Sequence, residues 1–443
     1  MGSIHKFTLN GKNLVFDVES GALHEFDAAA WRALDLIEAG LDEAAAVEAM
    51  RPEFGAEAAD GALAEIKKLK DEGLLWSEPR RPAGGVAPRV KALCLFLSED
   101  CNLSCRYCFV EGGLRPPARQ HMSETVGRAA IDFLIKVSSP RAHCEVDFFG
   151  GEPLLNFSAL QGITAYARRA FAAAGKEIAF TVTSNGLLLS PAVGDYLERE
   201  GFYTILSLDG RAEVHDRMRR RPGGGGSYNS VLPRLRAYTE RQPAGGYYVR
   251  GTYTRHNKDF TRDVEHLYAQ GFRYISLEPV VAAPGVDYAL RESDLPELER
   301  EYEKLAAFYL QCRAAGDPFQ FFHFTIDLEQ GPCLEKRLSG CGAGREYLAV
   351  TADGSIYPCH QLAGRPELCM GNVLEPESFN PDLPPSFVPA GPLQGRCREC
   401  WARYFCGGGA ASYLNGTPGE PYPLECALQR KRLECALYLH AAA

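Results

Sequence analysis

The chain has 443 residues, 46% of them apolar, and its 57 acidic and 48 basic side chains give a formal net charge of −9. This length allows two or three domains with a substantial core. The negative charge argues against a protein that binds nucleic acid by general electrostatic attraction. The sequence shows no apolar run of about 18 residues and no signal-peptide pattern, so we expect a cytoplasmic protein that does not cross a membrane.

The first segment predicts a small sheet with helices. Residues 4–27, "IHKFTLNGKNLVFDVESGALHEFD", alternate apolar and polar side chains around Asn10-Gly11, a dipeptide typical of a tight hairpin. The stretch 77–88 is rich in Pro and Gly and is typical of a linker. We therefore predict a first domain over residues 1–77. Its helices are predicted at residues 28–39, 41–50 and 56–72.

From about Val90, six short apolar runs alternate with helical segments. Repeated β–α units indicate a parallel sheet, and six units are fewer than the eight of a closed barrel. We predict an α/β fold with a partial (β/α)6 barrel over residues 90–310, whose working residues lie at the carboxyl ends of the strands. Residues 311–443 form a third domain with a Gly- and Cys-rich, irregular tail. The barrel helices are predicted at residues 126–137, 157–174, 191–200, 231–241 and 260–269.

Fifteen cysteines are many for a cytoplasmic chain, and they favour metal or redox chemistry over disulfides in a reducing compartment. Three of them lie in "CNLSCRYCFV", which follows the first predicted barrel strand: Cys101, Cys105 and Cys108. Structural zinc is the alternative, but zinc would need a fourth ligand and no histidine lies nearby. A [4Fe–4S] cluster bound by three cysteines leaves one iron open for another ligand.

This CxxxCxxC loop resembles that of the radical S-adenosylmethionine (SAM) enzymes. The resemblance implies that the three cysteines hold a cluster whose open iron binds the amino and carboxylate groups of SAM. One electron then splits the S–C5′ bond, and the 5′-deoxyadenosyl radical removes a hydrogen atom from the substrate. Tyr107 and Phe109 are implied cofactor contacts, with the Phe109 backbone near the adenine.

Other strand ends of the barrel agree with this resemblance. "GGEP" (Gly150, Gly151 and Glu152) follows the second strand and looks like the family's turn that approaches the SAM amino group. Ser184, Ser207 and Asp209 end the next strands and are expected to bond the ribose or methionine parts of SAM. Arg255 is expected to pair with the SAM carboxylate, and Glu278 points to the same rim. Ordinary polar strand ends and turns are the alternative for each.

The cysteines of the tail resemble the SPASM extension of radical SAM maturases, which carries two auxiliary [4Fe–4S] clusters. Ala410 stands in "CGGGA", where the family often has a cysteine that closes the first cluster. That cluster is therefore expected either to have an open iron that takes a substrate thiolate or to use Cys369. His360 follows a ligand and is a candidate base. The implied ligands are Cys333, Cys341 and Cys359 for the first cluster, and Cys397, Cys400, Cys406 and Cys426 for the second.

Residues 1–77 resemble the winged-helix-like recognition element of enzymes that modify ribosomally made peptides, and the whole chain resembles SCIFF-type maturases. This implies a Cys-rich precursor peptide whose leader binds the N-terminal sheet by strand addition. It also implies a thioether product, expected to be Cys–Thr, three [4Fe–4S] clusters, and an electron donor such as flavodoxin or ferredoxin. The alternatives are a carbon–carbon or carbon–oxygen crosslink, side-chain oxidation as in sulfatase maturation, or a regulator without turnover. A domain that serves only dimerisation or stability is the alternative for residues 1–77.

Overall fold

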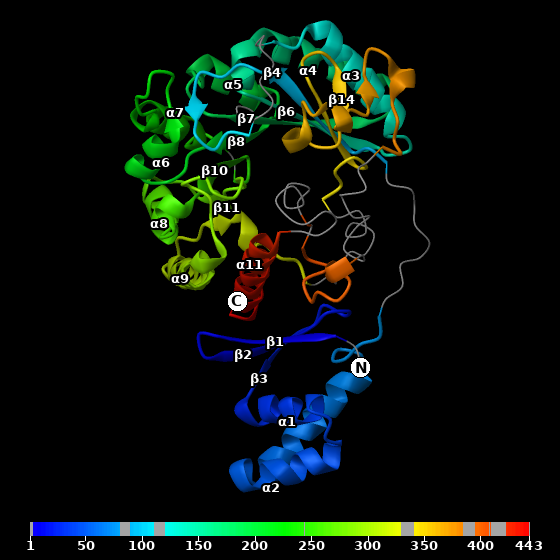
Figure 1. The fold of residues 1–443 in the computed structure, drawn as a ribbon, viewed down its shortest axis with the longest axis vertical. Helices are drawn as coiled ribbons and strands as arrows, with labels where there is room; N and C mark the ends of the chain where they lie inside the picture. The colour runs from blue at the N-terminus through cyan, green and yellow to red at the C-terminus, as the bar shows by residue number, and fades with distance from the viewer. Residues whose placement is uncertain are drawn as a thin grey trace.

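The computed structural model describes residues 3–79, 89–109, 120–242, 244–328, 341–383, 395–406, 408 and 422–442. The N-terminal sheet and its helices lie at one end of the molecule and the barrel lies at the other, with α11 between them (Figure 1). None of the described helices is long and apolar enough to span a membrane.

The N-terminal module is a three-stranded antiparallel sheet followed by two helices. Strands β1 (Ile4–Leu9), β2 (Lys12–Asp17) and β3 (Leu23–Phe26) pair in chain order. Asn10 and Gly11 form the predicted hairpin turn, both with positive φ, at 49° and 80°. Helices α1 (Ala28–Glu38) and α2 (Glu43–Asp71) pack on each other, and α2 joins two predicted helices across a kink at Gly55.

The central sheet is parallel, as predicted. Its strands are β4 (Ala92–Ser98), β6 (His143–Gly150), β7 (Glu177–Ser184), β8 (Tyr203–Ser207), β10 (Tyr247–Tyr253) and β11 (Tyr274–Pro279). They are neighbours in this order, and all pairs between them are parallel. Their carboxyl ends therefore meet along one rim. The two-residue strand β12 (Gln320–Phe321) continues the sheet beside β11.

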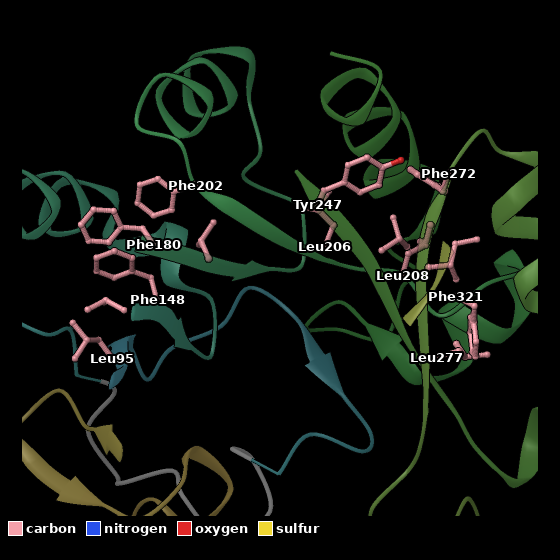
Figure 2. Packing of buried hydrophobic residues seen from close by; sticks show 14 of the residues in the cluster. Leu95, Phe148, Phe180, Phe202, Leu206, Leu208, Tyr247, Phe272, Leu277 and Phe321 are labelled. Atoms are coloured by element: carbon pink, nitrogen blue, oxygen red, sulfur yellow. The ribbon is translucent and has the colours of Figure 1, made fainter. Parts of the chain in front are cut away.

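Helices cover the outer face of this sheet. They are α3 (Glu124–Val137), α4 (Phe157–Ala173), α5 (Pro191–Arg199), α6 (Ala212–Met218), α7 (Tyr228–Thr239), α8 (Thr261–Ala269) and α9 (Leu295–Ala314). Buried aromatic side chains fill the space between the layers, and Figure 2 shows Phe148, Phe180 and Phe202 in one such group. Their ring centroids lie 5.4–6.0 Å apart. This packing fixes the strands whose ends form the rim.

The C-terminal segment is more regular than we predicted. β13 (Tyr347–Val350) joins the sheet parallel to β4, and β14 (Ser355–Tyr357) and β15 (Gly371–Asn372) continue it antiparallel. The expectation of an irregular tail is wrong for α11 (Pro423–Ala441), a 19-residue helix that packs on α9. Leu424, Leu428 and Cys435 give this helix a buried face, because they recur near the helical period.

Candidate functional site

A cavity of about 670 Å³ lies at the carboxyl ends of the barrel strands. The cysteine loop after β4 forms one wall, and the segment 280–286 after β11 forms another. Ten of the site residues predicted from the sequence line this cavity. They are Cys101, Cys105, Cys108, Tyr107, Phe109, Gly150, Gly151, Ser184, Ser207 and His360.

The cysteine loop is held in place by backbone pairing. The short strand β5 (Ser104–Cys105) pairs antiparallel with β9 (Arg219–Arg220), so that Cys105 lies opposite Arg219. The backbone N–H of Cys108 donates to the carbonyl of Cys105 at 3.1 Å, which curls the loop. Asn185 Nδ2 lies 3.7 Å from Cys101 Sγ. All three thiols thus face one cavity from a single rigid loop.

The charge environment of these thiols fits a cluster. Burial raises the pKa of Cys101 and of Cys105 to about 12, and proximity to Cys108 adds to both shifts. Like-charge repulsion among free thiolates is removed when each sulfur binds a cation, because coordination to a metal deprotonates the thiol outright. The donor set therefore fits an iron–sulfur cluster, and the cavity beside it has room for a nucleoside-sized molecule.

The glycines at the end of the second barrel strand allow their turn to lie very close to the chain that leads into the cysteine loop. Gly150 has φ of +127°, and a Cβ there would lie 2.2 Å from the carbonyl oxygen of Ser98. A Cβ on Gly151 would lie 2.3 Å from the carbonyl oxygen of Asp100. Both glycines are required for the turn to pack against the chain just before Cys101. The motif thus links the cysteine loop to β6.

Glu152 does not line the cavity but ties neighbouring strand ends together. Its fully buried carboxylate accepts hydrogen bonds from Ser184 Oγ at 2.9 Å and from the backbone N–H groups of Asn185 and Leu154 at 2.8 and 3.1 Å. Burial raises the pKa of Glu152 to about 7 despite these donors. The structure therefore gives Glu152 a positioning place behind the cavity wall, where we had expected a cofactor contact.

Asp209 also lies behind the cavity. It is fully buried, its Oδ1 accepts from Arg219 Nε and from the backbone N–H of Thr252 at 3.0 Å each, and its Oδ2 accepts from the hydroxyl of Tyr107 at 2.6 Å. The Arg219 guanidinium lies 5.4 Å from the Tyr107 ring. Asp209 and Arg219 thus form a buried ion pair that holds the cysteine loop through Tyr107. The sequence reasoning missed Arg219, and its place opposite Cys105 could not be read without the strand pairing.

Arg255 is not brought to the cavity. It lies beyond the end of β10 in a short 3-10 turn (Arg255–Asn257), where its Nε approaches Asp294 Oδ2 at 3.2 Å. The turn directs the side chain toward the start of α9 and away from the rim. Arg250 of β10 lines the cavity instead.

Glu278 lines the cavity, as expected of a residue at the end of β11, and is surrounded by two arginines and a histidine. Arg250 Nη2 lies 3.3 Å, His323 Nε2 3.4 Å and Arg432 Nη1 3.9 Å from its carboxylate oxygens. Burial would raise the pKa of Glu278, but His323, Arg250 and Arg432 together lower it to about 2. Arg432 comes from α11, so the tail closes this side of the barrel.

His360 connects the tail to the same cavity. Its Nδ1 lies 2.9 Å from the hydroxyl oxygen of Tyr347 and 3.7 Å from Cys359 Sγ. Its ring lies beside those of Phe109 and Phe149, with centroids 5.7 and 5.1 Å away. Burial lowers the pKa of His360 to about 4, so the imidazole is neutral near pH 7.

The four cysteines of the second predicted auxiliary set lie near one another. Burial raises the pKa of Cys426, at the start of α11, to about 11, and the charges of Cys406, Cys397 and Cys400 contribute. Burial is likewise the largest cause of the raised pKa of Cys406, followed among charges by Cys400 and Cys397. These four side chains, from two segments, are therefore close enough for their charges to influence one another.

The first predicted set is described only in part. Burial raises the pKa of Cys359 to about 12, and the charge of Cys341 adds to this shift. Cys341 and Cys359 are therefore neighbours. Cys369 packs in the same apolar cluster as Cys359 and donates its S–H to the carbonyl of Gly371 at 3.5 Å. Cys333 and Ala410 lie outside the described residues. Within the described ranges, no three His, Cys, Asp or Glu side chains are arranged for a single metal ion.

The N-terminal module contacts the loop between Cys400 and Cys406. The ring of His5 in β1 stacks on Trp401, with centroids 3.9 Å apart, and Phe16 in β2 packs edge-on against Phe405 at 5.5 Å. Glu19 forms a buried ion pair with Arg403. The second cysteine group is therefore packed directly on the N-terminal sheet.

Comparison with known proteins agrees with this geometry. A family model described as a 4Fe-4S single cluster domain matches residues 86–233, which include the cysteine loop. A serine-type anaerobic sulfatase-maturating enzyme of Klebsiella aerogenes is 23% identical over 375 residues, which span 80% of this chain and 86% of that protein. These matches make the chain similar to radical SAM/SPASM-type maturases. A cysteine-type anaerobic sulfatase-maturating enzyme of Clostridium perfringens is 23% identical over 344 residues, 73% of this chain and 89% of that one.

Two solved structures share the fold of this chain. Native anSMEcpe with bound AdoMet superposes with a TM-score of 0.66 at 19% identity and covers 79% of this chain and 98% of its own. Streptococcus suis SuiB bound to its precursor peptide SuiA gives a TM-score of 0.56 at 15% identity, over 95% of this chain and 98% of that one. The larger coverage by SuiB includes most of the chain outside the barrel.

Proposed function

We propose that this radical SAM maturase installs thioether crosslinks, most simply Cys–Thr, in a ribosomally made, Cys-rich precursor peptide. The product would join a cysteine sulfur to a carbon of the acceptor residue with net loss of two hydrogens: one would leave as an atom to the 5′-deoxyadenosyl radical and the other as a proton, and the surplus electron would pass to a cluster held by the chain. The observation that carries the proposal is the shared cavity: the three cysteines of the loop line it together with His360, which directly follows the tail cysteine Cys359.

The loop cysteines would hold the [4Fe–4S] cluster, and the cavity beside Phe109, Ser184 and Ser207 would take SAM. When bound, these cofactors supply a 5′-deoxyadenosyl radical that removes a hydrogen atom from the peptide. The chain's own contribution is placement. Glu152 and Asp209 fix the two turns that face the cofactors, and their burial makes that placement rigid.

The far wall would exclude water from the reacting carbon. The segment after β11 contributes Val280, Val281 and Ala282 to the cavity lining, and these side chains have no polar group. An apolar, closed wall keeps competing donors of hydrogen atoms away from a carbon radical. The three small apolar residues also leave room for a peptide chain.

His360 would accept the thiol proton of the substrate cysteine. Tyr347 engages its Nδ1, so within the described residues Nε2 is the nitrogen left for a substrate. Because burial lowers the pKa of His360 to about 4, the ring is neutral at pH 7, and in the tautomer whose Nδ1–H donates to the Tyr347 hydroxyl Nε2 has the lone pair that would accept the proton.

The N-terminal module would bind the leader of the precursor by strand addition. In the sheet order β1-β2-β3, the outer strands each have an edge without a strand partner in the described chain, and an extended peptide can pair with such an edge. Support comes from SuiB, a fold relative that was crystallised with its precursor peptide. The contacts of His5 and Phe16 with the tail would place a bound leader near the second cysteine group.

Mass spectrometry of the modified peptide tests this proposal. The maturase is coexpressed with each short Cys-rich reading frame encoded beside its gene, and the peptide is then treated with a thiol-alkylating reagent. We expect a loss of two hydrogens per crosslink and one fewer alkylated thiol for each. A mass change with every thiol still free would overturn the sulfur chemistry.

Side-chain oxidation as in sulfatase maturation is a second candidate, favoured by the sulfatase-maturating relatives. It predicts an aldehyde in the product and needs no second residue. A carbonyl-reactive probe on the same peptide separates the two, because a thioether does not react with it.

A further inference from the structure

Three exposed arginines lie beside the cysteine loop and form what we call the basic patch: Arg217, Arg220 and Arg221. Arg217 ends α6, a helix on the outside of the barrel (Figure 1), and Arg220 belongs to β9. None of the three forms an ion pair with a carboxylate in the part of the chain that the structure describes. Their charge is therefore available to a partner.

Three arginines next to the patch are neutralised. Arg219 pairs with Asp209 at 3.0 Å, Arg106 with Asp287 at 2.8 Å, and Arg211 with Asp259 and Asp263 at 2.8 Å each. Of the nearby acids, Asp216 is turned inward to accept the backbone N–H groups of Ser227 and Tyr228. Glu213 is exposed and lies 3.9 Å from Arg211. The patch is thus a local excess of positive charge on a chain of net charge −9.

The patch is joined to the cluster site by a fixed backbone ladder. Arg220 lies opposite Ser104 and Arg219 opposite Cys105 in the β5–β9 pair. The backbone N–H of Arg106 donates to the carbonyl of Met218 at 2.8 Å. On the other side of β9, Ser227 Oγ donates to the carbonyl of Arg219 at 2.7 Å, and His215 Nε2 lies 2.9 Å from the same oxygen of Ser227. A partner bound at Arg220 would contact β9, the strand that pairs directly with β5 and its Cys105.

We propose that the basic patch is the docking surface for an acidic one-electron carrier protein that delivers its electron to the cluster at Cys105. The proposal rests on the proposed function, because that function needs a reduced cluster. One electron leaves the carrier, which is oxidised by one electron, and the cluster is reduced by one; no proton or group moves. Unpaired like charges on one face steer an oppositely charged partner and speed its association, and electron-transfer encounters need only a small contact.

The test compares two charge-reversed variants of the full-length, cluster-loaded protein. Arg217→Glu/Arg220→Glu reverses two of the three charges of the patch. Arg300→Glu/Arg313→Glu is the matched control, because both of its arginines are exposed on α9, which packs against α8 and α11, and it makes the same change in charge. Reduction of the cluster is followed by loss of its visible absorbance in stopped flow, with either reduced flavodoxin or dithionite as the reductant.

We expect the patch variant to lose about 10-fold or more of its second-order rate with flavodoxin at low salt, and to lose most of its salt dependence. The control variant keeps the wild-type rate with flavodoxin, and both variants keep the wild-type rate with dithionite, a small reductant that needs no docking surface. Equal flavodoxin rates in the patch variant and the wild type would overturn the proposal. A fall with dithionite as large as that with flavodoxin would also overturn it, because it would show a damaged cysteine loop.

An acidic segment of the precursor peptide is the other occupant that the charge would suit. If the patch variant loses affinity for the peptide but keeps its rate with flavodoxin, the assignment to an electron carrier is wrong. Because the readout is cluster reduction and not a crosslinked product, failure to find a thioether would count against the proposed function alone.

Discussion

Replacing Asp209 by Asn tests how the cysteine loop is held. Asp209 is fully buried, and its carboxylate pairs with Arg219 and accepts the Tyr107 hydroxyl and a backbone N–H. Asparagine has almost the same shape but no charge, so it leaves the Arg219 guanidinium inside the protein without its counter-ion. Removal of one partner of a buried pair costs about 3–5 kcal/mol, because the remaining charge is uncompensated. The mutation should also loosen Tyr107 and the loop that carries it.

The assay is thermal unfolding of the purified protein, with Asp287→Asn as the matched control. Asp287 pairs with Arg106 of the same loop, but its side chain is 57% exposed, and such surface pairs contribute only about 0–1 kcal/mol. For a unit the size of the barrel, 3–5 kcal/mol corresponds to a fall of about 6–20 °C in Tm. The control should fall by about 4 °C at most. Equal Tm values for the two variants would refute the view that Asp209 and Arg219 hold the loop.

Three further predictions concern the groups around the site. Burial raises the pKa of Glu152 from 4.5 to about 7, so the folded protein binds this proton more tightly than the unfolded chain does. The free energy of unfolding should therefore fall by about 3 kcal/mol as the pH rises from 4.5 to 7. Urea titrations of Glu152→Gln should show a flatter dependence of stability on pH, and an unchanged dependence would contradict this prediction. Glu19→Ala leaves the buried Arg403 without its counter-ion and should lower the free energy of unfolding by about 3–5 kcal/mol in the same titrations. A loss under about 1 kcal/mol would mean that this ion pair does not join the modules. Cys400→Ala should still release 5′-deoxyadenosine but give no crosslinked peptide by mass spectrometry, and wild-type crosslinking would remove the second cluster from the reaction.

Much of the barrel could be predicted from the sequence because its elements repeat a simple pattern. The runs that became β4, β6, β7 and β8 are apolar and short, and turn residues such as Gly150 and Gly210 end them. Such local signals are independent of distant parts of the chain. The helix starts were also marked locally, as by Ser190, whose side chain caps α5. For the same reason the loop of three cysteines could be placed at the rim before the structure was known.

The remainder depends on contacts between distant segments. Arg219 reaches the cysteine loop only because β9 pairs with β5, and Arg432 reaches Glu278 only because α11 packs beside the barrel. Arg255 illustrates the opposite case: its place after a strand suggested a rim position, but the 3-10 turn and Asp294 take it elsewhere. The sequence analysis interpreted Cys426 of α11 as a metal ligand and did not predict a helix from the apolar residues that follow it. Cys435 of that helix is fully buried and packs in the core.

Release of 5′-deoxyadenosine is the measurement that bears most directly on the assignment of the cysteine loop. Anaerobically reconstituted protein is reduced with dithionite in the presence of SAM, and the nucleoside is quantified by chromatography. Wild-type protein should release it and Cys101→Ala should not, whereas Cys144→Ala, which changes a buried thiol at the start of β6, should behave as the wild type. Release by Cys101→Ala at the wild-type rate would show that the loop does not hold the iron that binds SAM.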